Sequence, residues 1–117
     1  MALFTSSSTN AQTTSLGTAT YATLTGEVSS ANGYTTGGVS VAPTWSNASG
    51  TETFTTANAT WTASGSGITA RTAVLYDSTS GDLICWSVLD STPADVTVSA
   101  GNTLTVQANG SGVFTVA

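Results

Sequence analysis

The chain has 117 residues, of which seven carry a charged side chain: one Arg and six acids, with no Lys and no His. Enzymes build proton shuttles, activated nucleophiles and metal cages mainly from His, Lys and Cys clusters, so this composition argues against an enzyme and predicts no cofactor. The net charge of -5 offers phosphate groups no basic patch, so neither nucleic acid nor a membrane is expected as a partner.

The N-terminal segment differs in composition from the rest of the chain. Residues 1–15 are nearly all Ser, Thr, Asn, Gln and Ala, and after the first Met only Leu3 and Phe4 carry large apolar side chains. We interpret residues 1–15 as an extended arm, which either docks on a neighbouring subunit through Leu3 and Phe4 or is a frayed terminus. Residues 16–117 are then expected to form one domain. The start lacks the basic and apolar regions of a signal peptide, so synthesis in a cytoplasm without export by that route is expected.

After the arm, apolar and polar residues alternate over short stretches that are separated by turn signals. Such alternation is typical of half-buried strands. The candidate strands in the first half of the domain, not all of which need form, are residues 21–28, 39–42, 51–55 and 59–63. Pro43 limits the second of these to an edge strand or a strand end. Trp45 follows it, beside a predicted turn at residues 47–50.

The second half has the clearer pattern. Strands are predicted at residues 68–76 and 83–89, joined by a hairpin loop at 77–82, and then at 96–98, 103–106 and 113–116. The 25 Thr residues suit strands because Thr is β-branched and keeps a solvent face polar without charge. No stretch of 12 residues has an apolar stripe of helical period. The sequence therefore predicts an all-β fold, a β-sandwich or jelly-roll-like domain of seven or eight short antiparallel strands.

Two acids flank the predicted hairpin loop and raise the question of glycoside hydrolysis. That chemistry needs two carboxylates roughly 5–10 Å apart. We expect Asp77 and Asp82 to cap the turn through backbone hydrogen bonds, and a weak Ca²⁺ site is the alternative. Cys85 is the only Cys and stands in an apolar strand, so it is expected to be a small buried hydrophobe and not a reactive thiol.

Two further side chains are candidates for partner binding. Arg71 is the only cation, and it is expected to pair with an acid, within the chain or across an interface, or to reach a partner. The three Trp residues lie within alternating segments, where core packing is the default. Trp45 is the expected exception and could stack on a sugar or on a partner's surface. The predicted partner-binding residues are therefore Leu3, Phe4, Trp45 and Arg71.

Several short motifs carry a resemblance to a known family. They are Tyr34-Thr35-Thr36-Gly37-Gly38-Val39, Trp61-Thr62-Ala63, the run from Ile68 to Asp77, a second apolar strand ending near Asp90, Val98 to Val106, and Gly112 to Val116. On these motifs residues 34–117 resemble a family of small tailed-phage virion proteins. The resemblance implies a non-enzymatic structural component of the virion, a capsid decoration or cement protein that binds and stabilises the assembled head shell from outside.

The resemblance also implies the partners. They would be the major capsid protein and further copies of the chain itself, with a trimer favoured over a dimer. A Ser/Thr surface suits this role because it offers hydrogen bonds without the desolvation penalty of buried charge. The alternative is a tail or tail-fibre module with an exposed Trp or Tyr face that binds host glycans.

Overall fold

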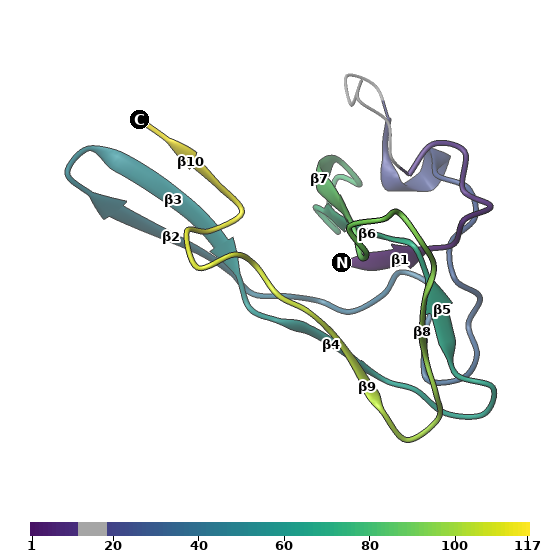
Figure 1. The fold of residues 1–117 in the computed structure, drawn as a ribbon. Coiled ribbons are helices and arrows are strands. Elements are labelled where there is room, and N and C mark those ends of the chain that lie inside the picture. Colours follow the sequence, from purple (N-terminus) through teal and green to yellow (C-terminus); the bar gives the residue numbers. More distant parts are fainter. Residues whose placement is uncertain (12–18) are drawn as a thin grey trace.

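Short strands make up almost all of the regular structure of this chain. The computed structural model describes residues 1–11 and 19–117, and every strand pair in it is antiparallel. Ten strands form four small sheets, and no α-helix occurs in these two ranges (Figure 1). The prediction of an all-β antiparallel fold is therefore confirmed.

The four sheets are small. The first has the order β1-β6-β7, with strands Ala2–Phe4, Thr72–Tyr76 and Leu83–Val88. The second has the order β10-β3-β2, with strands Phe114–Val116, Thr51–Thr56 and Pro43–Ala48. The other two pair β4 (Ala59–Thr62) with β9 (Thr103–Val106), and β5 (Ile68–Ala70) with β8 (Val96–Val98). The described residues contain neither a closed barrel nor a clear sandwich, so only the coarse fold prediction is confirmed.

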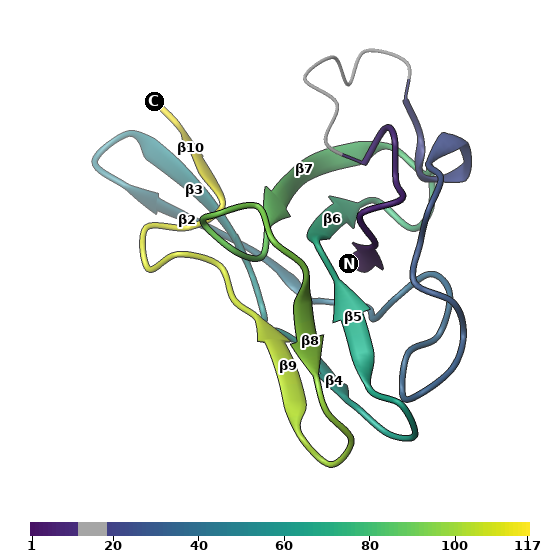
Figure 2. The same ribbon diagram turned by 45° about the vertical axis from the view of Figure 1, so that its right-hand side comes forward.

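The second sheet projects from the rest of the molecule, and we call it the protruding sheet. Both views of the ribbon place β2, β3 and β10 together at one end, away from β5 and β8 (Figures 1 and 2). A two-residue loop joins β2 to β3, and both Ser49 and Gly50 have positive φ angles, 52° and 85°. Such loops match the twist of a hairpin. The Cα extents of 47 × 30 × 30 Å agree with this elongated shape.

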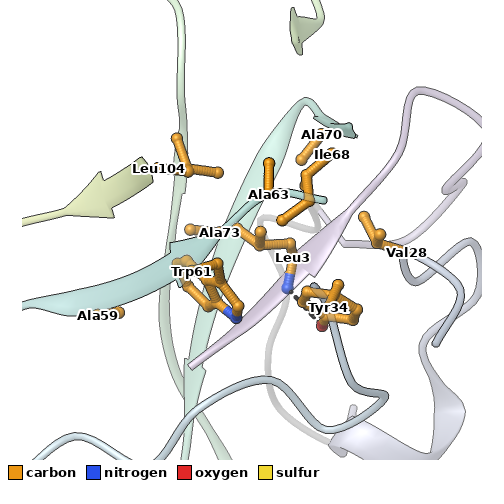
Figure 3. Packing of buried hydrophobic residues seen from close by; sticks show 10 residues of the cluster. All are labelled: Leu3, Val28, Tyr34, Ala59, Trp61, Ala63, Ile68, Ala70, Ala73 and Leu104. Carbon is orange, nitrogen blue, oxygen red and sulfur yellow. Dashed lines mark hydrogen bonds between the residues drawn. The ribbon is translucent and has the colours of Figure 1, made fainter. Parts of the chain in front are cut away.

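The core has two parts, one on each face of the first sheet. Successive residues of a strand point to opposite faces, so Leu3 enters one cluster and its neighbours Ala2 and Phe4 enter the other. Figure 3 draws the first cluster, in which Leu3 lies among side chains from β4, β5 and β6. Its buried residues are Leu3, Val28, Tyr34, Ala59, Trp61, Ala63, Ile68, Ala70, Ala73 and Leu104.

The N-terminal residues belong to this core, which corrects the prediction of an extended arm. Strand β1 pairs with β6, and Leu3 and Phe4 are 0% and 1% exposed. Its other edge is bonded too: the amide of Val28 donates to the Leu3 carbonyl at 2.9 Å, and the Met1 ammonium donates to the Val39 carbonyl at 2.7 Å. Leu3 and Phe4 therefore anchor their own chain, and neither side chain is accessible to a neighbouring subunit. The predicted arm boundary at residue 15 lies outside the described residues.

Three predicted strands differ in detail from the structure. Residues 21–28 form a single 3-10 turn, η1 (Tyr21–Thr23), followed by one isolated bridge between Glu27 and Phe4. Residues 39–42 form no strand, and β2 begins at Pro43, a position where a strand needs no N–H donor. The strand predicted at 68–76 is split at Arg71, whose amide donates to the Phe4 carbonyl at 2.8 Å. The chain thereby passes from the β5-β8 sheet to the first sheet.

Candidate functional site

One face of the protruding sheet is aromatic. The strand register places Trp45, Phe54 and Phe114 side by side, with ring centroids 4.9 to 5.8 Å apart. Phe54 in the middle strand is buried, whereas Trp45 is 56% exposed and Phe114 is 39% exposed. Val116 is two residues beyond Phe114 on the same face and is also exposed. We call this the aromatic face. It is the largest group of exposed apolar side chains in the described part of the chain.

The opposite face of the same sheet is polar and uncharged. Alternation puts the following residues there: Thr44, Ser46, Ala48, Thr51, Thr53, Thr55 and Thr115. Glu52 is the only charged side chain of the three strands; it lies on the aromatic face across from Val116 and accepts a hydrogen bond from the Asn47 amide at 2.7 Å. All six residues of the edge strand β2 are exposed. The sheet therefore presents the aromatic face, which also carries Glu52 and Asn47, a face made mainly of Ser and Thr, and an uncharged edge.

A groove of about 430 Å³ lies between the aromatic face and the body of the molecule. Trp45, Phe54 and Thr56 line it on the side of the protruding sheet, and Tyr76 and Asp77 line it on the side of the body. Trp45 is thus the one predicted partner-binding residue that is exposed and lies in a groove. Of the other two Trp residues, which were expected to pack in the core, Trp61 is buried at 3% exposed and Trp86 is half-buried.

A second groove of about 350 Å³ adjoins the same junction. Thr56 and Leu75 line both grooves, and Cys85 lines the second. Cys85 is half-buried, not fully buried as predicted, and this burial raises the pKa of its thiol. Thr56 is 8% exposed, and its Oγ1 has no hydrogen-bond partner among the described residues.

Asp77 behaves as a turn cap. Its Oδ1 accepts hydrogen bonds from the amides of Thr79 and Ser80 at 2.7 and 3.3 Å, and these hold the pKa of the carboxyl below its usual range. The capping interpretation is confirmed for Asp77. In residues 1–11 and 19–117, no group of three or more His, Cys, Asp or Glu side chains could hold a metal ion.

Arg71 is paired within the chain. Its Nε donates to Asp95 Oδ1 at 2.8 Å, and the two side chains are about one-third exposed, 33% and 36%. The Ser6 hydroxyl donates to the other oxygen of Asp95 at 3.1 Å. Of the possibilities that the sequence left open, the structure shows an intrachain salt bridge. Arg71 lines neither groove.

The sequence did not reveal a polar network around Glu27. Tyr21 and Tyr34 both donate to its carboxylate, the latter at 2.7 Å, and the Gly37 amide donates to the same carboxylate at 2.7 Å. Tyr76 stacks on Tyr21 with centroids 4.3 Å apart and donates to the Gly37 carbonyl at 2.8 Å. Two of the three tyrosines thus bond to the Glu27 carboxylate, and the third, Tyr76, joins them through Gly37 and the Tyr21 ring. Nothing in their spacing signals this, because it depends on how a loop without regular structure folds.

This network holds strand β1 in place. The Tyr34 hydroxyl accepts a hydrogen bond at 3.0 Å from the amide of Leu3, a buried strand residue. Burial raises the pKa of Tyr34, and the Glu27 carboxylate raises it further. The network therefore has a structural role, because it bonds residues 21–37 to strand β1. The candidate binding surface is then the aromatic face together with the groove beside it.

Comparisons with known proteins identify no relative. No family model matches the chain, and neither the curated proteins nor the solved structures contain a match. Within the part of the chain that the structure describes, no helix is long and apolar enough to cross a membrane.

Proposed function

We propose that this chain is a non-enzymatic structural protein of a tailed-phage particle, a capsid decoration protein that binds and stabilises the assembled head shell. The observation that carries the proposal is the protruding sheet, which projects at one end of the molecule (Figure 1) and whose aromatic face has Trp45, Phe114 and Val116 exposed. The motifs in residues 34–117 that resemble phage virion proteins support the same role.

The aromatic face has the chemistry of an attachment surface. Trp45, Phe114 and Val116 leave apolar area in water, and covering such a side chain contributes roughly 1–3 kcal/mol. A shell presents many equivalent sites, so modest contacts of this kind sum through multivalency. With Glu52 as its only charged side chain, the sheet should bind its partner with little dependence on salt.

The partners in this proposal are the major capsid protein and further copies of the chain, in a homo-oligomer for which a trimer is favoured over a dimer. Natural sheets protect their edges with charges, bulges or proline, and β2 carries only Pro43 at its first position. An uncharged edge of six exposed residues is suited to pairing with a strand of another chain. The outer surface of the head is the proposed location, because the net charge of -5 disfavours contact with packaged DNA.

A binding assay on purified heads tests this proposal. Heads that lack the chain are incubated with the wild-type protein or with the double variant Phe114→Ser/Val116→Ser, and occupancy is measured after sedimentation. We expect at least a tenfold weaker binding of the double variant. The matched control Thr53→Ala/Thr115→Ala changes the opposite face of the same sheet and should bind like wild type. Equal binding by wild type and the aromatic-face variant would overturn the proposed attachment surface.

A tail or tail-fibre module that binds host glycans is the second candidate function. It is favoured by one observation, the exposed indole of Trp45 at the edge of a groove. Immunogold labelling of intact particles separates the two candidates, because the label falls on the head in one case and on the tail in the other.

A further inference from the structure

The groove beside Trp45 joins an aromatic platform to polar groups. We propose that this groove binds a neutral oligosaccharide, which stacks on Trp45 and donates hydroxyl hydrogen bonds to Asp77. This inference rests on the second candidate function, from which it takes glycan binding, and it does not depend on attachment to the head.

Trp45 provides a fixed platform. Its ring packs against Phe54 at 4.9 Å with an interplanar angle of 56°, and against Phe114 at 5.8 Å in a T-shaped arrangement. These contacts hold the indole while 56% of the residue stays exposed. The apolar C–H face of a sugar ring can cover such a surface, and tightly packed neighbours limit the side-chain entropy lost on binding.

Asp77 provides the acceptor on the opposite wall. Its Oδ1 is fixed by the amides of Thr79 and Ser80, so the carboxylate needs little reorganisation to receive a ligand. Hydrogen bonds to an ionised acceptor are roughly twice as strong as those between neutral groups. Asp77 is the only charged side chain in the lining, and the Met1 ammonium, whose residue also lines the groove, is bonded to the Val39 carbonyl. Because the chain as a whole carries a net charge of -5, a saccharide with carboxylate or sulfate groups would be repelled. This charge balance selects a neutral saccharide.

Thr56 adds an unsatisfied polar atom at the same place. Its Oγ1 is buried and has no hydrogen-bond partner among the described residues, and Thr56 lines the groove. A buried polar group without a partner costs roughly 1–3 kcal/mol. A ligand hydroxyl or a bridging water that reached this atom would recover that loss. The volume of about 430 Å³ lies within the range of roughly 300–1,000 Å³ that is usual for ligand sites.

The test begins with a microarray of neutral, sialylated and sulfated oligosaccharides probed with the wild-type protein. The neutral glycan with the strongest signal is then titrated by calorimetry against wild type, Trp45→Ala and Asp77→Asn. We expect each variant to bind at least tenfold more weakly. Asp77→Asn keeps an oxygen that can accept the two amide hydrogen bonds, so it should fold even if Trp45→Ala does not.

Two matched variants control for nonspecific effects. Asp82→Asn removes the same charge from the same loop, and Val116→Ser changes the aromatic face, yet neither residue lines the groove. Both should bind within twofold of wild type. The proposal is overturned if no neutral glycan binds, if only acidic glycans bind, or if both groove variants bind like wild type. Salt-sensitive binding of an Arg- or Lys-containing peptide at this groove, without glycan binding, would also overturn it.

The two proposals fail separately. Asp77→Asn should occupy heads like wild type, since Asp77 lies on the body and not on the aromatic face. If Asp77→Asn loses glycan binding but occupies heads normally, the result supports the groove proposal and says nothing about attachment. If Phe114→Ser/Val116→Ser loses head occupancy, the result supports the attachment surface and says nothing about the groove.

Discussion

Replacing Leu3 by Ala tests whether the N-terminal segment is a core strand. Leu3 is 0% exposed, and the cluster around it joins strands from three of the four sheets. Truncating a buried Leu to Ala destabilises a protein by about 2–5 kcal/mol, through lost transfer energy and the cavity that remains. Because strands from separate sheets cannot easily close such a cavity, we expect a loss of about 3–5 kcal/mol. At this chain length that corresponds to a fall in Tm of roughly 12–20 °C.

Urea denaturation followed by Trp fluorescence measures the effect. Trp61 lies in the same cluster and reports on its packing. Val116→Ala is the control, because it truncates an apolar side chain that is exposed, and it should change the free energy of unfolding by less than about 0.5 kcal/mol. A similarly small change for Leu3→Ala would refute the core-strand reasoning and restore the interpretation of an arm. Deletion of strand β1 should unfold the protein, because it removes the buried side chains of Leu3 and Phe4 from the core.

Three further substitutions probe other parts of the structure, each by urea denaturation. Tyr34→Phe leaves the buried Leu3 amide without an acceptor and should cost about 1–3 kcal/mol. Because burial raises the tyrosine pKa above its usual 10.0, wild-type stability should fall as the pH rises past that value, and Tyr34→Phe should show a smaller fall. Gly38→Ala should lower the free energy of unfolding by more than about 3 kcal/mol beyond the loss caused by Gly50→Ala. Both glycines have positive φ, but a Cβ at Gly38 would meet a backbone oxygen at 1.9 Å, whereas a Cβ at Gly50 would meet nothing within 4 Å. Arg71→Ala should lose less than about 1 kcal/mol, with a smaller effect in high salt, since its ion pair is partly exposed.

The strand pattern of the second half could be predicted because it is local. Residues 83–89, 96–98, 103–106 and 113–116 alternate between clear turn signals, and strands β7 to β10 occupy nearly these ranges. The split at Arg71 could not be predicted, because it follows from a hydrogen bond to Phe4, which is far away in the chain.

The first strand escaped prediction for a different reason. Ala2–Phe4 is only three residues long and is buried on both faces, so it shows no alternation. A short apolar run next to a polar tract is equally typical of a docking arm, and composition cannot distinguish the two.

The candidate site was predicted in part. Trp45 was singled out because it follows Pro43 beside a turn, and the structure places it exposed on an edge strand. Its neighbour Phe114 comes from the last strand, and Asp77 comes from a loop of the body. Phe114 lies beside Trp45 because of the register of β10 with β3, and Asp77 lies across the groove because of where the protruding sheet sits on the body. Neither the register nor the position of the sheet can be inferred from a single sequence.

A reconstruction of the intact particle, at a resolution that identifies this chain, tests the central claim most directly. We predict that the chain lies on the outer surface of the head, with Trp45, Phe114 and Val116 covered by a shell subunit or a neighbouring copy. A chain absent from the head, or one bound to it with the aromatic face open to solvent, would contradict the account.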